Sequence, residues 1–352
     1  GCDIDIDSCG VAPLGSSVRD RYNELTLRYK AFDLVFRAYN EGVAYRFVSR
    51  SDKRVGVQDE QAEFTFPGNW DAVVPYCREA DRTIEKQIEC SFENVYYQFK
   101  LQDWDKARAA FLPLVVGAPN GYKVAITEAD LFNFPGLNVR NLNGSKTLEG
   151  FHARVPKQVK QGGHNMLQGV ILSSEDFIAK DCKPGCAFPW RVIQIAREDK
   201  ELACSDMVYK LATAPEARDW SWVKPGKVAW DWWNDWNLYG VDFKAGINND
   251  TYKYYIDFAS EKGIEYVILD EGWAVNKQAD LMQIIPEIDL EELCAYAKEK
   301  NVGLILWAGY WAVNRDMESV FLHYSRMGVK GFKIDFMDRD DQDMVNFYTA
   351  CA

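Results

Sequence analysis

The stretch Gly331-Phe332-Lys333-Ile334-Asp335-Phe336 is a short apolar run that carries one lysine and, near its end, a carboxylate. Comparable runs occur at three earlier places in the second half of the chain, and stretches of helical length separate them. Apolar strands that alternate with helices are typical of a parallel sheet covered on both faces. The sequence therefore predicts four strands, which begin at residues 228, 264, 302 and 331, and helices at 250–262, 290–300, 316–327 and 342–352.

Carboxylates stand at the ends of three of these four strands. Asp231 follows the first, Asp270 the second and Asp335 the fourth, whereas the third ends at Trp307. In a (β/α)8 barrel, all the C-terminal strand ends converge on one face, where the loops build the active site. Helix capping would also explain an aspartate, but each of these precedes its helix by many residues. We therefore favour a barrel over a doubly wound sheet. In a doubly wound sheet that binds a dinucleotide, the motif G-x-G-x-x-G follows the first strand, and this sequence lacks it there.

Residues 1–204 have a different pattern, in which short β-branched or aromatic runs alternate with turns. Gly, Pro, Asn and Asp bound several of these runs, as at Asn40-Glu41-Gly42. This pattern is typical of a β-sandwich. We expect strands within 28–36, 42–48, 63–67, 94–102 and 122–126, and one short helix at 103–111. The chain would then consist of an N-terminally incomplete β-sandwich domain at 1–204, a linker at 205–226 and the first half of the barrel at 227–352.

The composition argues against several classes of partner. Acidic residues outnumber basic ones by 53 to 41, and the formal net charge of −12 disfavours binding to nucleic acid. No stretch is long and apolar enough to span a bilayer. The only close pair of cysteines, Cys182 and Cys186, lacks the second pair that a zinc site would need. Aromatic residues reach 14%, with 12 Trp, which suits stacking on sugars but also a β-rich core.

Clustered carboxylates beside tryptophans point to the hydrolysis of glycosidic bonds. That reaction uses one carboxylate as nucleophile or base and a second, protonated carboxyl as acid. Lys333 lies two residues before Asp335, so both side chains leave the strand on the same side. Its ammonium would keep the carboxylate ionised and could also bind a sugar hydroxyl. His164 lies in the Gly-rich stretch Gln161-Gly162-Gly163-His164-Asn165, which could either present it to the barrel mouth or leave it as a plain loop residue.

Several long and rare strings resemble glycoside hydrolase family 97, and together they span nearly the whole chain. Members of this family are secreted or periplasmic bacterial α-glycosidases. The resemblance therefore implies a bacterial hydrolase of carbohydrate metabolism that is periplasmic or secreted. The strings are Arg19-Asp20-Arg21-Tyr22-Asn23-Glu24-Leu25, Phe66-Pro67-Gly68-Asn69-Trp70, Phe188-Pro189-Trp190-Arg191, Ala229-Trp230-Asp231-Trp232-Trp233 and Leu269-Asp270-Glu271-Gly272-Trp273.

The family has two mechanistic branches, and this sequence resembles the retaining one. The inverting branch, typified by α-glucosidases, lacks the aspartate after the fourth strand and uses a glutamate elsewhere as base. The retaining branch resembles α-galactosidases and carries the aspartate in a string like Phe332-Lys333-Ile334-Asp335-Phe336. The resemblance implies a retaining, exo-acting α-galactosidase of α-galactoside oligosaccharides, with Asp335 as nucleophile. It implies sugar contacts at Asp270 and Trp273 and, as weaker candidates, at Asp231, Trp307 and Lys333.

Family members also bind calcium beside the active site, through oxygen ligands from both the sandwich domain and the barrel. The string Val124-Ala125-Ile126-Thr127-Glu128-Ala129-Asp130 resembles the contribution of the sandwich domain, which implies Glu128 as a Ca²⁺ ligand. Carboxylate oxygens suit this hard cation.

One departure from the family pattern concerns length. A complete (β/α)8 barrel takes about 250 residues, whereas only four strand–helix units fit between Gly226 and Ala352. We therefore expect the general acid/base glutamate, the remaining calcium ligands and a C-terminal β domain to lie outside this chain, and the chain alone to be inactive. Two alternatives stay open: an inverting α-glucosidase of the same family, and a relative that binds sugar without catalysis.

Overall fold

The structure is a computed structural model, and it describes residues 3–5, 17–78, 80–214, 219, 221–275 and 277–352. The chain divides into two compact units. The first comprises Gly1–Gln158, Ser173–Val223 and Asp338–Ala352, and the second comprises Val159–Leu172 and Lys224–Met337. The segment 159–172 thus belongs to a different unit from the residues on both sides of it in the sequence, and 338–352 to a different unit from the residues that precede it. The three-part division into 1–204, 205–226 and 227–352 stays a prediction.

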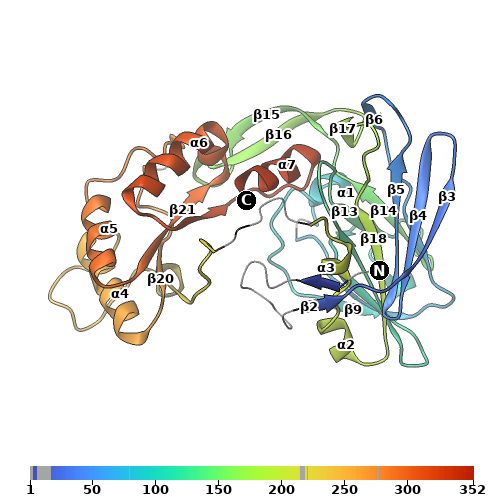
Figure 1. Ribbon diagram of the computed structural model, residues 1–352, viewed down its shortest axis with the longest axis horizontal. Coiled ribbons are helices and arrows are strands. Elements are labelled where there is room, and N and C mark those ends of the chain that lie inside the picture. Colours follow the sequence, from blue (N-terminus) through green and yellow to red (C-terminus); the bar gives the residue numbers. More distant parts are fainter. Residues whose placement is uncertain (1–2, 6–16, 79, 215–218, 220, 276) are drawn as a thin grey trace. The chain divides into compact units, whose positions relative to one another are not determined.

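Antiparallel strands make up most of the first unit (Figure 1). Its largest sheet has eight strands and a second has four. The eight lie in the order β3 (Asn23–Arg28), β4 (Phe32–Tyr39), β5 (Gly42–Ser49), β18 (Trp190–Ala196), β12 (Lys123–Ala129), β11 (Leu114–Gly117), β8 (Asp71–Val74) and β9 (Tyr97–Lys100). The four are β10 (Ala109–Ala110), β13 (Leu137–Arg140), β14 (Thr147–His152) and β7 (Glu63–Thr65). Two small sheets pair β1 (Asp3–Asp5) with β2 (Ser17–Arg19) and β6 (Val55–Val57) with β17 (Ala179–Cys182).

The two larger sheets share one hydrophobic core. Strand β8 alternates exposed and buried residues, and its buried members Ala72 and Val74 belong to that core. Leu137, Val139 and Leu148 enter the same core from the four-stranded sheet. Side chains that alternate in this way and meet between two sheets define a sandwich. The predicted β-sandwich is therefore confirmed as a sandwich-like pair of sheets.

Two local predictions in this unit are wrong. The expected helix at 103–111 is instead a 3₁₀ turn, η2 (Leu101–Asp103), followed by strand β10, whose Ala109 and Ala110 pair with β13. The expected strand at 28–36 is two strands, because the chain turns after Arg28 and Tyr29 N donates to Phe32 O at 2.9 Å. At 109–110 pairing with the distant strand β13 decides the conformation, whereas at 28–36 the chain forms a tight hairpin whose two strands pair with each other.

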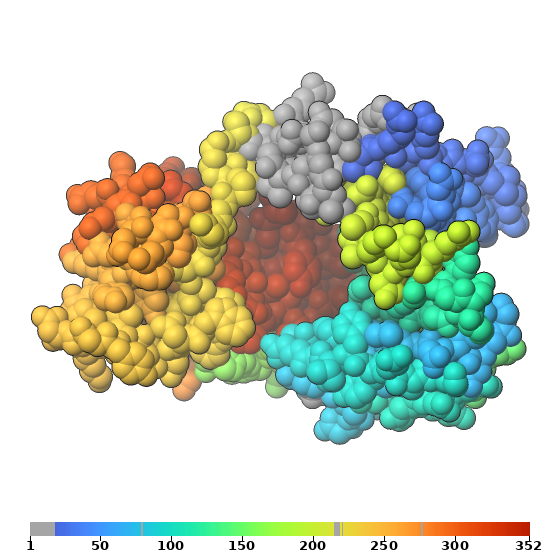
Figure 2. Space-filling model, turned by 90° about the horizontal axis from the view of Figure 1, so that it is seen from below, coloured from blue at the N-terminus to red at the C-terminus, as the bar shows by residue number. Residues whose placement is uncertain are grey.

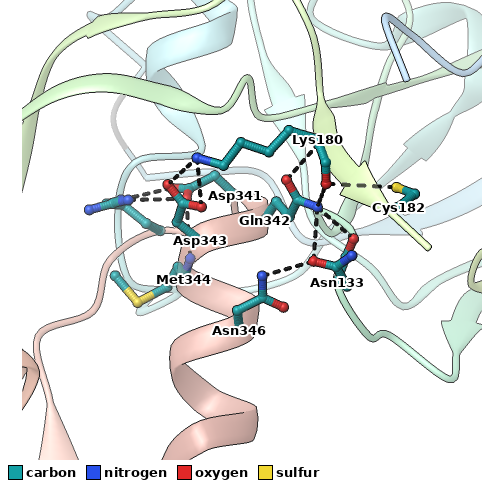
Figure 3. Close-up of polar contacts among 9 residues, drawn as sticks. Asn133, Lys180, Cys182, Asp341, Gln342, Asp343, Met344 and Asn346 are labelled. Carbon is teal, nitrogen blue, oxygen red and sulfur yellow. Dashed lines mark hydrogen bonds and ion pairs between the residues drawn. The ribbon is translucent and has the colours of Figure 1, made fainter. Parts of the chain in front are cut away.

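Short helices complete the first unit: α1 (Ile84–Gln87), α2 (Asp199–Ala203), α3 (Met207–Leu211) and α7 (Gln342–Cys351). Helix α7 is attached through Gln342, whose amide nitrogen donates to the carbonyl oxygens of Asn133 and Lys180, each at 2.9 Å (Figure 3). Lys180 N donates in return to Gln342 Oε1 at 2.8 Å. Asp341 caps the helix by accepting from Met344 N. The helix that follows the fourth predicted strand is therefore held by residues of the sandwich unit.

A buried ionic cluster links the two sheets. Arg191, on β18, donates to both oxygens of Glu60 at 2.8 and 2.6 Å and to Glu128 at 2.7 Å. His152, on β14, places its Nε2 3.0 Å from the same guanidinium. Burial, together with Arg191, holds the pKa of His152 well below its ordinary value, so the imidazole is neutral. Two carboxylates therefore share one cation in a region shielded from water.

Replacement of Arg191 should strongly destabilise the sandwich. Arg191→Met leaves Glu60 and Glu128 without their counter-ion, and breaking a buried pair in this way costs on the order of 3–5 kcal/mol. Urea unfolding monitored by circular dichroism measures the loss. As a control, Lys100→Met removes the exposed ion pair with Asp71, which should cost less than about 1 kcal/mol. Equal losses in both variants would contradict a dominant role for the buried cluster.

The second unit contains the four predicted strands as one parallel sheet. They lie in sequence order: β19 (Val228–Trp230), β20 (Tyr266–Leu269), β21 (Gly303–Gly309) and β22 (Gly331–Asp335). The connecting helices α4 (Asn249–Lys262), α5 (Leu290–Glu299) and α6 (Tyr310–Met327) pack against these strands. The yellow and orange residues of this unit, which include α4 and α5, form part of the molecular surface in Figure 2. Parallel strand–helix alternation is thus confirmed, whereas closure into a barrel stays a prediction.

Local sequence explains where these helices begin and end. Asn248 caps α4 by accepting from Thr251 N, and Asp289 caps α5 in the same way from Glu292 N. Gly263 and Gly328 end α4 and α6 with φ of +64° and +112°, a conformation that glycine adopts without strain. Helix α6 begins at Tyr310 rather than at the predicted Asp316, where the backbone is instead kinked.

A β-hairpin completes the second unit. It consists of β15 (Pro156–Gly162), a 3₁₀ turn η3 (His164–Met166) and β16 (Gln168–Ser174), and its tip, 159–172, belongs to this unit. At the tip, Leu167 O accepts from Trp311 N at 2.9 Å. The Leu167 side chain lies so close to Gly309 that a Cβ on that glycine would meet it at 2.8 Å. The hairpin tip is therefore packed against the carboxyl end of β21.

Candidate active site

The predicted site residues of the second unit meet at the carboxyl ends of its strands. Asp231 and Asp270 directly follow β19 and β20, and Asp335 is the last residue of β22. Register pairs Trp307 with Lys333 and Gly309 with Asp335 on adjacent strands. Because parallel strands in register end at the same edge of a sheet, these groups come together.

Asp270 is a buried carboxylate whose two oxygens are both engaged. Its Oδ2 accepts from Lys333 Nζ at 2.8 Å and from Trp230 Nε1 at 2.6 Å, and its Oδ1 accepts from Glu271 N at 2.8 Å. Only 4% of the residue is exposed. The Lys333 ammonium also lies 4.2 Å from the centroid of the Trp230 ring, which is a cation–π arrangement. These contacts fix the position of the ammonium.

Asp335 has a different environment from Asp270. Its Oδ2 accepts from Trp307 Nε1 at 3.1 Å and lies 3.7 Å from Lys333 Nζ, and its Oδ1 accepts from Phe336 N at 2.8 Å. Its side chain is 40% exposed. Two N–H donors and one ammonium thus stabilise the negative charge of Asp335. The carboxylate stays accessible, which suits a nucleophile.

Asp231 lies beneath Asp270 and is fully buried. Its Oδ2 accepts from Tyr252 Oη at 2.7 Å and from Asp270 N at 3.2 Å. Burial raises its pKa to about 6, although both hydrogen bonds oppose that shift. With 0% exposure, Asp231 is placed to hold the backbone of Asp270. A direct sugar contact at this residue stays a prediction.

The two predicted tryptophan contacts are also buried. Trp273 Nε1 donates to Trp307 O at 2.9 Å, and the Trp273 ring packs edge-on against Tyr324 with centroids 5.4 Å apart. The indole nitrogen of Trp307 faces Asp335, as described above. In this arrangement, Trp307 binds the candidate nucleophile directly, and Trp273 supports Trp307. Their contacts with sugar stay predictions.

Sequence reasoning missed two residues of this network, Trp230 and Tyr252. Trp230 donates to Asp270 and packs against the Lys333 ammonium, whereas the tryptophans predicted from the sequence were Trp273 and Trp307. Tyr252 reaches Asp231 from the first turn of α4. The position of Trp230 next to Asp231 is a sequence signal that could have identified it. The pattern of α4 contains no comparable signal for Tyr252.

Glu128, the predicted calcium ligand, lies in the first unit at the end of β12. Its Oε1 accepts from Leu137 N at 3.0 Å and its Oε2 from Arg191 Nη1 at 2.7 Å. Burial raises its pKa despite the neighbouring guanidinium. Each oxygen has one partner and keeps one lone pair, so the carboxylate can still accept a cation. Among the described residues, no group of three or more His, Cys, Asp or Glu side chains could hold a metal ion, so Glu128 could supply only part of a site.

Two family models match successive parts of the chain. Glycosyl-hydrolase 97 N-terminal matches residues 10–214, and glycoside hydrolase 97 matches residues 232–352. The chain belongs to glycoside hydrolase family 97. The resemblance inferred from the sequence strings is therefore confirmed.

Curated relatives of this family 97 chain carry galactosidase names. A "Retaining alpha-galactosidase" of Bacteroides thetaiotaomicron is 56% identical over 339 residues, which cover 96% of this chain and 51% of that protein. A "Probable retaining alpha-galactosidase" of Streptomyces bingchenggensis is 27% identical, over 93% of this chain and 46% of its own length. The chain thus spans about half the length of the curated relatives it matches.

A solved structure shows that the fold is that of family 97. A glycoside hydrolase family 97 enzyme from Pseudoalteromonas sp. strain K8, in complex with acarbose, superposes with a TM-score of 0.72 at 22% identity. The match covers 96% of this chain and 54% of that one. None of the helices in the described part of the family 97 chain combines the length and apolar character required to cross a membrane.

Asp231→Asn should reduce the dependence of stability on pH. Because burial raises the pKa of folded Asp231 to about 6 from an ordinary 3.8, the folded chain binds this proton more tightly than the unfolded chain. The resulting contribution to stability is complete below the ordinary pKa of 3.8 and is lost as the pH rises through the folded pKa of about 6. The loss amounts to roughly 3 kcal/mol. Urea unfolding from pH 4 to 7 should therefore show a smaller fall for the variant. Glu261→Gln, at an exposed glutamate of α4, should keep the wild-type slope.

Proposed function

We propose that the protein carrying this chain is a retaining, exo-acting α-galactosidase whose nucleophile is Asp335. The observation that carries the proposal is the contrast between two carboxylates beside one lysine. Asp270 is buried with both oxygens engaged, whereas Asp335 is accessible and stabilised by Trp307, Lys333 and the Phe336 amide. The 56% identity to a protein named as a retaining α-galactosidase supports the choice of sugar and stereochemistry.

The chemistry follows from this arrangement in two steps. An oxygen of Asp335 attacks the anomeric carbon of the terminal galactosyl unit, and the bond to the leaving oxygen breaks as a general acid gives that oxygen a proton. Water then attacks the same carbon, the conjugate base removes a proton from the water, and Asp335 is released as a carboxylate. Two inversions retain the α configuration. In this proposal the general acid/base is a glutamate.

Lys333 and Asp270 prepare the nucleophile in this proposal. Asp270 and Trp230 hold the Lys333 ammonium, which then stands 3.7 Å from the Asp335 carboxylate. The same ammonium and the Asp270 carboxylate are suited to bind sugar hydroxyls. The substrates proposed are α-galactoside oligosaccharides, and the proposed location is the periplasm or the exterior of a bacterial cell.

We also propose that Glu128 is one ligand of a Ca²⁺ ion. Two carboxylates, Glu60 and Glu128, face the single guanidinium of Arg191, and His152 is neutral. The cluster therefore contains more acidic groups than cations.

The decisive test of the function uses Asp335 variants of the natural full-length protein that carries this chain. Asp335→Gly should lower kcat on 4-nitrophenyl α-galactoside by about 10³-fold or more, because the covalent intermediate cannot form. Azide should restore part of the activity and yield β-galactosyl azide. Asp257→Asn, at an exposed carboxylate of the same unit, is the matched control and should keep full activity.

Proton NMR of the first-formed sugar separates the remaining alternatives. Retention releases the α-anomer, and an initial β-anomer would instead indicate an inverting enzyme and remove Asp335 from its role. Preference for α-glucosides would favour the α-glucosidase. Binding of galactose without any turnover would identify a sugar-binding relative.

Calcium binding has its own test. Glu128→Gln keeps the shape of the side chain but removes its charge, and it should raise the Kd for Ca²⁺, measured by isothermal titration calorimetry of the full-length protein, by at least about tenfold. Glu63→Gln, on the exposed face of β7, is the control. Equal Kd values for wild type and Glu128→Gln would refute Glu128 as a ligand.

A further inference from the structure

The tip of the β15–β16 hairpin is folded in an unusual and costly way. Gly163 has φ of +66° and ψ of −154°, a backbone conformation that is open essentially only to glycine. Asn165 and Met166 both have positive φ, at +46° and +64°. Side chains rarely adopt this conformation, and strain of this kind is found mostly where a site requires it.

The strained turn is held by contacts on both sides. His164 N donates to Gln168 Oε1 at 3.0 Å within the hairpin. On the outer side, Asn165 O accepts from Lys277 N at 3.1 Å, and Leu167 O accepts from Trp311 N at 2.9 Å. These contacts attach the hairpin tip to the loop that follows β20 and to the first turn of α6. The position of His164 is therefore defined by the second unit itself.

His164 is directed at the residues that flank both candidate carboxylates. Its Nε2 lies 3.3 Å from Glu271 Oε2, and Asn165 Nδ2 donates to Glu271 Oε1 at 2.5 Å. Glu271 directly follows Asp270. The His164 ring also packs against Phe336, with centroids 4.8 Å apart, and the Phe336 amide binds Asp335.

The chemistry of this group suits recognition of a hydroxyl. His164 Nε2 lies between two partners, Glu271 Oε2 at 3.3 Å and Asn165 Nδ2 at 3.0 Å, which leaves Nδ1 as the ring nitrogen for a ligand. The His164 side chain is 53% exposed, so the imidazole is accessible. An imidazole nitrogen donates or accepts a hydrogen bond according to its tautomer, and a sugar hydroxyl can do either, so a histidine held in this way beside the nucleophile can bind such a hydroxyl.

We propose that His164 binds a hydroxyl of the galactosyl unit that is cleaved, with Glu271 and Asn165 as its positioning residues. The inference rests on the proposed function and extends it to a residue outside the four strand–helix units. It assigns a role in sugar recognition to the strained hairpin, which the strand-end carboxylates do not explain. Phe336 connects His164 with the candidate nucleophile, because its ring contacts His164 and its amide binds Asp335.

The test compares galactose binding in variants of the natural full-length protein. His164→Ala should raise the inhibition constant of free galactose, and the KM values for 4-nitrophenyl α-galactoside and for an α-1,6-linked galactosyl glucose, by a common factor of about 5–30. His164→Gln, whose amide can both donate to Glu271 and accept from a hydroxyl, should recover part of the loss. Lys160→Ala, at an exposed residue of β15, is the matched control and should behave as wild type.

The outcomes separate this inference from the proposed function. If wild type and Lys160→Ala hydrolyse α-galactosides and His164→Ala leaves the galactose inhibition constant unchanged, the inference is overturned while the function stands. An effect limited to the disaccharide would also overturn it, because it would place His164 against the leaving group. A thermal melt of each variant shows whether His164→Ala has unfolded, and in that event the His164→Gln variant decides. Absence of α-galactoside hydrolysis in wild type would overturn both proposals.

Discussion

Parallel pairing in register of β19, β20, β21 and β22 is the constraint on which the candidate site depends. It brings the carboxyl ends of all four strands to one edge of the sheet, so residues more than a hundred positions apart in the sequence become neighbours. Within this frame, Lys333 reaches Asp270 two strands away. A one-residue slip of β22 would turn Lys333 and Asp335 to the opposite face and separate them from Trp307.

Three aspartates at equivalent strand ends have three different environments. Asp231 is fully buried and supports the backbone, Asp270 is buried and holds the ammonium, and Asp335 is accessible. The difference comes from what packs above each strand end. Tyr252 of α4 covers Asp231, whereas Asp335 is covered only in part by Trp307 and the Phe336 turn. Exposure thus increases from Asp231 to Asp270 to Asp335, and the three aspartates differ in their roles for this reason.

Much of this arrangement could be predicted from the sequence. Apolar runs and glycine stops locate the strands and the ends of α4 and α6, and the spacing of Lys333 and Asp335 predicts that they share a face. The prediction of secondary structure failed where pairing between strands far apart in the sequence decides the structure. At 103–111, a local pattern suggested a helix, but Ala109 and Ala110 pair with a strand that lies far along the chain. Trp230 and Tyr252 were not identified as parts of the network because their partners, Asp270 and Asp231, lie elsewhere in the sequence. His164 was noted in its Gly-rich stretch, but its contacts with Glu271 and Phe336 could not be predicted.

The sequence by itself determined the family, the order of the strands and the identity of the carboxylates at their ends. These follow from local composition and from rare strings of residues, which need no knowledge of neighbours in space. Only the tertiary structure decided which carboxylate is buried, which is accessible, and that His164 faces Glu271 and Phe336. It also assigned α7 to the sandwich unit through Gln342. Burial and hydrogen-bond partners depend on which side chains come together when the chain folds, and that information is absent from any single stretch of sequence.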